Sequence, residues 1–293
     1  MRNHKKLIML LVDPTVGFCE AGDNQPEGGL PVAGARESMN RLAGVIEKLG
    51  DDIDQIVSLI DMHPRDHISM SPFWVKSDGS RIVPFVDFAD PVTGITTITH
   101  DLFSSGEVFP INGRTPKKNP TDLDTDYEWV DFYLQELERL GRFQCQIWPT
   151  HQVVMTQDVV YHAHIGQAIE AWEVRTGKAH KVFPKGDFRL CEAYSGIQAE
   201  VPHPGVPSTG LRTNLISVIN RPDTQTIAGG IAGSHCIRFT GIDLMDNFGK
   251  ENLKNVAFIE DCSPAVPGCE SQKEEFFNTL RANGCETPNA IDI

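Results

Sequence analysis

Two short apolar runs with a helical pattern between them constrain the fold of this chain most strongly. Residues 7–12 are entirely apolar, and residues 55–60 are apolar except for Gln55 and Ser58. Residues 31–50 carry apolar side chains at helical spacing and end at a glycine. Continuous apolar runs are typical of strands that are buried on both faces of a parallel sheet. A strand, a helix and a second strand in succession connect parallel strands. We therefore predict an α/β fold with a parallel, doubly wound sheet.

Two further apolar runs, residues 226–231 and 255–259, flank a helical stretch that begins after Cys236. Open α/β sheets bind their ligands at the carboxyl ends of the strands. Asp13, Asp61 and the segment after Ile231 each follow such a strand. We therefore expect these three positions to lie close together.

Residues 71–146 have a different composition, rich in Pro, Gly, Asp and Thr, with one helical pattern at 127–140. We interpret the chain as a single domain, residues 1–293, with an insertion at about 71–146, and we expect another helix at about 157–175. A long insertion at this edge of a sheet is often functional. It would act as a lid, or its aromatic residues would form a satellite core or a subunit contact. These aromatics are Phe73, Trp74, Phe85, Phe88 and Trp129.

Composition excludes several classes of protein. The 293 residues are enough to bury a large core without a disulfide or a metal. A formal net charge of −14 argues against a nucleic-acid partner. The seven cysteines show no CxxC spacing, which favours reduced thiols and a cytoplasmic protein. No apolar stretch approaches the roughly 20 residues of a membrane span, so we expect no membrane partner.

Three residues have the context expected of a catalytic group. Cys236 follows a buried strand and a turn of small residues, so it is expected at a helix N-terminus, where the thiol pKa is lowered. Asp13 ends the first strand, and Lys185 ends a short apolar piece. Each also has an ordinary interpretation. The cysteine could be structural, the aspartate could cap a loop, and the lysine could be exposed.

Asp61-Met62-His63 offers two metal ligands on one side of an extended segment, because side chains alternate along a strand. Asp with His suits zinc, manganese or iron. His151, in Trp148-Pro149-Thr150-His151, is a candidate third ligand. Position alone does not decide between it and other histidines, which are His67, His162, His164 and His180.

Several motifs, taken in order, resemble the nicotinamidase and isochorismatase-like family of cysteine hydrolases. Each motif is weak alone, but their order along the chain is specific, and the similarity covers the core to about residue 267 without the insertion. The motifs are Val12-Asp13 with Phe18, the loop 29–34, Asp61-Met62-His63-Pro64 with His67-Ile68-Ser69, Trp148-Pro149-Thr150-His151, Lys185-Gly186 with Tyr194-Ser195-Gly196, the turn 230–236 and Asp261-Cys262-Ser263.

The resemblance implies a three-layer α/β/α sandwich and the hydrolysis of nicotinamide to nicotinate and ammonia, as in NAD salvage. It also implies a divalent metal, zinc with manganese or iron as alternatives, a cis peptide at Ile231–Ala232, and a homo-oligomer. The implied catalytic residues are Asp13, Lys185 and Cys236, with the N–H groups of Ala232 and Cys236 as the oxyanion hole. The implied substrate contacts are Phe18, Trp148 and Tyr194, and the implied metal ligands are Asp61, His63 and His151.

Two departures from the family pattern leave the substrate open. Thr15 replaces the usual glutamine two residues after the aspartate, and Gln152 replaces the usual cysteine after the histidine of the Trp-Pro motif. The alternatives are a related amidase acting on another small amide or carbamoyl compound, and a catalytically silent homologue that uses the insertion for binding. The intact Asp, Lys and Cys argue against silence.

Overall fold

A five-stranded parallel sheet forms the centre of the molecule in the computed structural model, which describes residues 6–22, 24–112, 126–221 and 223–293. This confirms the predicted α/β fold. The register pairs Asp61 with Lys185 and Val12 with Gly230, so the carboxyl ends of four strands meet at one edge. The strand order is β7 (Lys181–Lys185), β2 (Ile53–Asp61), β1 (Lys6–Val12), β8 (Thr224–Gly230) and β9 (Val256–Phe258).

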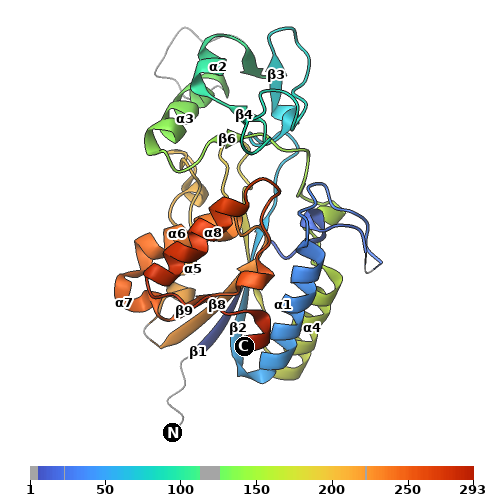
Figure 1. Ribbon diagram of the computed structural model, residues 1–293, viewed down its shortest axis with the longest axis vertical. Coiled ribbons are helices and arrows are strands. Elements are labelled where there is room, and N and C mark those ends of the chain that lie inside the picture. Colours follow the sequence, from blue (N-terminus) through green and yellow to red (C-terminus); the bar gives the residue numbers. More distant parts are fainter. Residues whose placement is uncertain (1–5, 23, 113–125, 222) are drawn as a thin grey trace.

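Helices cover both faces of this sheet (Figure 1). On one face, α1 (Ala35–Leu49) and α4 (Ala163–Thr176) lie side by side. The other layer contains α5 (Thr213–Ile219), α6 (Cys236–Phe248), α7 (Lys250–Leu253) and α8 (Glu270–Ala282). The apolar positions of α1 that the sequence places at helical spacing are buried against the sheet, and the helix ends at Gly50 with φ 51°.

Two helices begin later than the sequence predicts. α1 begins at Ala35 and not at Pro31, because Gly34 adopts a left-handed conformation immediately before it. α4 begins at Ala163 and not near residue 157. Residues 157–159 form a separate 3-10 turn, and Tyr161 pairs with Thr15 in an isolated β-bridge. The bridge between Tyr161 and Thr15, which follows β1, therefore holds the chain extended before residue 163 despite its helical pattern.

Most of the insertion forms a lobe at one end of the molecule, next to the carboxyl edge of the sheet (Figure 1). The lobe has its own apolar cluster, to which residues 188–201 contribute. We propose that it is an insertion into a single domain. Its elements are β3 (Trp74–Lys76), β4 (Thr97–Ile98), α2 (His100–Ser104), β5 (Val108–Pro110), α3 (Asp126–Leu140) and β6 (Cys145–Gln146).

The aromatic residues of the insertion mostly form a satellite core. Phe73, Trp74 and Trp129 are fully buried in the cluster of the lobe, and Phe88 packs against it. Phe85 is 46% exposed, and its ring centroid lies 6.1 Å from that of Trp148. The structure therefore supports the satellite core for four of these five side chains. Phe85 lies beside Trp148, a predicted substrate contact, and the lid and the subunit contact stay predictions.

Short 3-10 turns connect several elements, and their bounds are η1 (Val16–Phe18), η2 (Gly50–Asp52), η3 (Ser71–Phe73), η4 (Gln157–Val159), η5 (Pro207–Thr209), η6 (Glu260–Cys262) and η7 (Ala290–Asp292). All seven cysteines are buried free thiols in this structure. Among the described residues, no helix combines the length and apolarity that a membrane crossing requires.

Candidate active site

Lys185 ends the edge strand β7, and its ammonium is the centre of a polar cluster at the carboxyl edge of the sheet. Its Nζ atom is 3.0 Å from Asp13 Oδ2, 2.7 Å from Asp61 Oδ1 and 3.4 Å from Cys236 Sγ. Four strands position these groups: Asp13 directly follows β1, Asp61 and Lys185 end β2 and β7, and Cys236 begins α6 after β8. The structure therefore brings together the three residues predicted to be catalytic.

The polar groups of this cluster are removed from water. Lys185 and Asp13 are fully buried, and Asp61 and Cys236 are 2% and 5% exposed. Asp13 accepts a hydrogen bond of 2.8 Å from the Asp61 N–H, and its backbone adopts φ 48°. A non-glycine residue in this conformation is uncommon and occurs often at functional sites. Lys185 also donates to the Ala193 carbonyl at 3.3 Å.

Burial and the lysine act in opposite directions on the acidic groups. Burial raises the pKa of Asp13 to about 7, although Lys185 opposes this shift. Burial also raises the pKa of the Cys236 thiol well above its usual value, again against Lys185, so the lowered thiol pKa expected from the helix N-terminus is wrong. Burial alone would lower the pKa of Lys185, but Asp13 and Asp61 outweigh it and raise that pKa. Lys185 thus stays charged, while the thiol and Asp13 are suited to share a proton.

The turn that carries Cys236 has the predicted form. β8 ends at Gly230, the Ile231–Ala232 peptide is cis, and α6 begins at Cys236. The N–H groups of Ala232 and Cys236 donate to no backbone carbonyl among the described residues. Two unused N–H groups beside a nucleophile can bind an oxyanion.

A narrow pocket opens onto the Cys236 thiol. Trp148 donates a hydrogen bond of 2.7 Å to the Tyr194 hydroxyl, and the Phe18 ring lies 5.6 Å from that of His151. These aromatic rings give the pocket flat apolar walls. The predicted site residues that line it are Phe18, Asp61, His63, Trp148, His151, Tyr194, Ala232 and Cys236; Asp13 and Lys185 lie outside this lining and contact its residues.

Two of the predicted metal ligands are oriented for coordination. His63 Nδ1 lies 2.8 Å from the Gly186 carbonyl and His151 Nδ1 2.8 Å from the Pro149 carbonyl, so each ring donates there and leaves Nε2 unprotonated. Asp61 Oδ2 lies 3.7 Å from His63 Nε2. The ring centroids of His63 and His151 are 5.2 Å apart. This donor chemistry fits a divalent ion.

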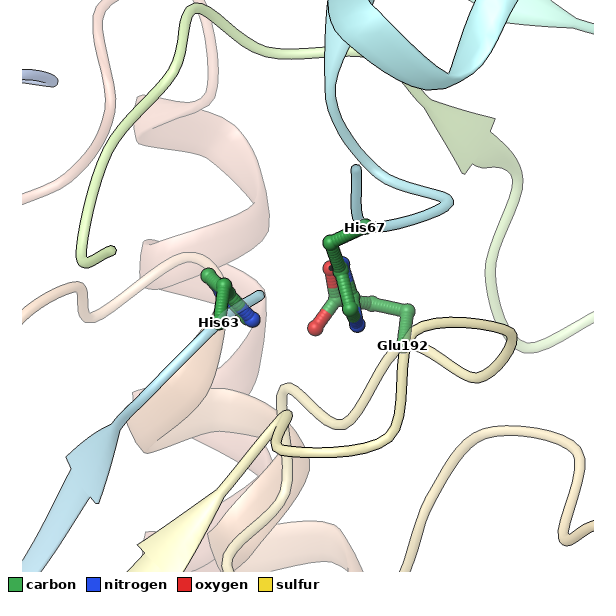
Figure 2. A group of neighbouring side chains, drawn as sticks. All are labelled: His63, His67 and Glu192. Atoms are coloured by element: carbon green, nitrogen blue, oxygen red, sulfur yellow. Dashed lines mark ion pairs between the residues drawn. The ribbon is translucent and has the colours of Figure 1, made fainter. Parts of the chain in front are cut away.

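A tighter group of possible ligands shares His63 but differs in the other two members. Figure 2 shows His63 and His67 from the segment after β2 and Glu192 from the loop after β7. Their ligand atoms lie within 4.8 Å of one another, a condition that the predicted set does not meet. However, His67 Nδ1 is 2.8 Å from Ser69 Oγ and its Nε2 is 3.0 Å from the Cys191 carbonyl. Both nitrogens of His67 are thus engaged within the protein.

Sequence reasoning missed Glu192 and His235, which also line the pocket. Burial raises the pKa of Glu192, and its Oε1 accepts from the Ala193 N–H at 2.7 Å. His235 Nε2 lies 3.1 Å from Gln146 Oε1, and burial lowers the pKa of this ring to about 3. Their only signal was position, since Glu192 lies between two site segments and His235 precedes the nucleophile.

The two departures from the family pattern contact each other. Gln152 donates a hydrogen bond of 2.7 Å from Nε2 to Thr15 Oγ1, and both side chains are fully buried. A glutamine amide thus reaches the segment after Asp13 from another part of the chain. The two positions at which the motifs differ from the expected pattern therefore form a single contact.

No protein-family model matches this sequence, and neither does any curated protein. Among solved structures, a nicotinamidase/pyrazinamidase from Acinetobacter baumanii is 19% identical with a TM-score of 0.56, over 98% of each chain. The yeast nicotinamidase is 16% identical with a TM-score of 0.59, over 97% of this chain and 99% of its own. A Pyrococcus horikoshii pyrazinamidase, solved in complex with zinc, is 14% identical with a TM-score of 0.51, over 97% and 99%.

These likenesses extend over nearly the whole chain, and their TM-scores show a shared fold, which is all that likenesses at 14–19% identity show. The three-layer architecture implied by the sequence motifs is therefore confirmed. What this chain does follows from the chemistry of its own site.

Proposed function

We propose that this chain is a cysteine-dependent amidohydrolase that converts nicotinamide to nicotinate and ammonia. The observation that carries the proposal is the buried Lys185 ammonium in contact with Asp13, Asp61 and Cys236 at the base of an aromatic pocket. A thiol beside a carboxylate and a cation is the arrangement of an activated nucleophile. The likeness of the whole chain to solved nicotinamidases supports the same class of reaction.

In the first step, Asp13 takes the proton of the Cys236 thiol while the sulfur attacks the amide carbon. Lys185 keeps its charge and stabilises the negative charge that develops on the Cys236 sulfur, as well as the Asp61 carboxylate. The carbonyl oxygen becomes an oxyanion, which the N–H groups of Ala232 and Cys236 bind. Each such donor typically lowers the activation free energy by roughly 3 kcal/mol.

Collapse of this intermediate breaks the C–N bond, and the proton held by Asp13 passes to the leaving nitrogen, so that ammonia departs. Water then attacks the thioester, with Asp13 accepting its proton. The C–S bond breaks, Asp13 returns its proton to the sulfur to restore the thiol, and the acid leaves as the carboxylate, its proton being taken up by ammonia to give ammonium. Atoms and charges balance with water as the only co-substrate.

Asp61, His63 and His151, which line the same pocket as Cys236, would hold a divalent metal there. Such an ion supplies a Lewis acid that binds and orients a ring nitrogen of the substrate. Zinc suits this donor set, and the Pyrococcus horikoshii relative in fold was solved with zinc. The walls formed by Phe18, Trp148 and Tyr194 then hold the flat ring with its carboxamide toward Cys236.

Ammonia release from a panel of amides tests the proposal. The panel contains nicotinamide, benzamide, which lacks the ring nitrogen, and a small aliphatic carbamoyl compound. We expect nicotinamide to have the highest kcat/KM. A preference for the carbamoyl compound would identify a related amidase, and no turnover of any amide by the metal-loaded protein would indicate a silent homologue.

A further inference from the structure

A second cavity, larger than the pocket at Cys236, lies between the end of α3, the segment that follows it, and the first turns of α6 and α8. It encloses about 450 Å³, a size typical of small-molecule sites. His235 lines both this cavity and the pocket at Cys236. The hydrogen bond of 3.1 Å between His235 and Gln146 belongs to the wall between them.

Two arginines approach one aromatic ring of this cavity. The guanidinium carbons of Arg142 and Arg238 lie 5.9 Å and 5.2 Å from the ring centroid of Phe239. Arg142 is paired with Asp243 at 2.9 Å, but its Nε atom is buried without a hydrogen-bond partner. Both arginines line the cavity, and among the described lining residues Glu138 is the only acid.

Arg238 is the less satisfied of the two cations. It is partly buried, and among the described residues its guanidinium forms no ion pair and no hydrogen bond. Burial and the nearby Arg142 both lower its pKa, although Glu275 opposes this shift. Leaving a partly buried cation without a counterion is unfavourable. The chain has a net charge of −14, so a cavity lined by two arginines and one acid has a charge opposite to that of the whole protein.

We propose that this cavity binds a small organic oxyanion, a carboxylate or a phosphate ester. Arg238 forms the main contact, because its planar fork of donors matches both groups bidentately. Arg142, which also approaches the Phe239 ring, adds a second guanidinium to the lining. Phe143 and Phe239 contact the apolar body of the ligand, which lies directly behind His235.

Calorimetric titration of the full-length protein with benzoate and with inorganic phosphate tests the site. Benzamide, the neutral counterpart of benzoate, reports binding that does not depend on charge. We expect at least one anion to bind, with an affinity that falls at least about tenfold in Arg238→Gln and less in Arg238→Lys. Tighter binding of benzoate would identify a carboxylate ligand, and tighter binding of phosphate a phosphate ester.

A second pair of variants avoids any loss of folding at Arg238. Gln272 on α8 lines the cavity, while its neighbour Ser271 is exposed outside it. Gln272→Glu should weaken anion binding about tenfold, whereas Ser271→Glu, with the same net charge, should not. If neither anion binds to the wild type, or if Arg238→Gln and Gln272→Glu both leave the affinity unchanged, the cavity is not an anion site. Neither result depends on amidase activity.

Discussion

Lys185 is the residue on which the site depends, because one buried ammonium balances three acidic groups. Its contacts with Asp13 and Asp61, at 3.0 Å and 2.7 Å, are the only salt bridges that either carboxylate makes to a lysine or arginine within the described chain. A buried ion pair is costly to form and much more costly to break on one side. The lysine therefore has a structural role in addition to its proposed catalytic one.

Replacing Lys185 by methionine should destabilise the protein strongly. The substitution leaves two carboxylates buried without their cation, so we expect the free energy of unfolding to fall by about 3–5 kcal/mol. Lys178→Met is the control, since its pair with Asp54 spans 3.8 Å and is over 40% exposed, and should cost less than about 1 kcal/mol. Urea denaturation measures both; equal effects would show that the Lys185 cluster is not a tight buried pair.

Metal content distinguishes the two groups of possible ligands. His151 has a free Nε2, whereas both nitrogens of His67 are bonded within the protein. We therefore expect His63→Ala and His151→Ala to lose a bound divalent ion that the wild type retains after dialysis. Elemental analysis by mass spectrometry measures the ion-to-chain ratio. Full retention in His151→Ala would show that Glu192 and His67 complete the site in its place.

The residues that could be predicted from sequence were those in ordered motifs. Asp13, Lys185 and Cys236 follow strands, and the topology of a parallel sheet brings such positions together. Glu192 could not be predicted, because a single acidic residue in a loop has no periodic signal. The Gln152–Thr15 contact was equally hidden, because it joins side chains 137 positions apart.

At the scale of elements, the exit from β8 sets the position of the nucleophile. Gly230 has φ 145°, and a Cβ atom added there would lie 1.9 Å from the Val12 carbonyl oxygen on β1. Only glycine allows the two strands to approach this closely while the chain turns toward Cys236. The strand pairing and the turn thus depend on the same residue.

Gly230→Ala should therefore disrupt the centre of the sheet. We expect a loss of about 4 kcal/mol or more, or no folded protein. Gly44→Ala is the matched control, because an added Cβ in the middle of α1 meets nothing within 4 Å, and it should stabilise by up to about 1 kcal/mol. Thermal denaturation followed by circular dichroism compares the two. A Gly230→Ala protein as stable as the wild type would contradict the close approach of Gly230 to the Val12 carbonyl.

Apolar runs predicted β1, β2, β8 and β9, and helical spacing predicted α3 and all of α1 except its start. β7 was recognised only as a short apolar piece. Apolar periodicity failed at the start of α4, where a bridge between Tyr161 and Thr15 holds the chain extended. It also could not identify the short strands of the insertion, which are two or three residues long and show no period.

At the scale of the whole molecule, a buried charge cluster connects the insertion to the core. Arg142 follows α3, Asp243 lies on α6, and Glu200 lies in the loop after β7. Arg142 Nη2 lies 2.9 Å from Asp243 Oδ1 and 4.0 Å from Glu200 Oε2. One cation thus faces two buried carboxylates, and burial raises the pKa of Glu200 to about 8.

This cluster predicts a defined pH dependence of stability. Because the folded state holds the Glu200 proton more tightly than the unfolded chain, its contribution is complete below about pH 4.5 and is lost as the pH rises toward 8. Glu200→Gln removes that loss, so the stability of the variant relative to wild type should increase from pH 5 to pH 8. Urea denaturation across this range measures the difference. A relative stability that is constant or falls with pH would contradict the assignment.

The nucleophile is the central claim, and ammonia release by the metal-loaded full-length protein tests it most directly. Cys285 is the matched control, because it is also a free thiol with 5% exposure, but it lies away from the site. We predict that Cys236→Ala lowers kcat for nicotinamide by about 10⁴-fold or more while retaining its fold, and that Cys285→Ala keeps wild-type turnover. Turnover by Cys236→Ala at the wild-type rate would show that this thiol is not the nucleophile.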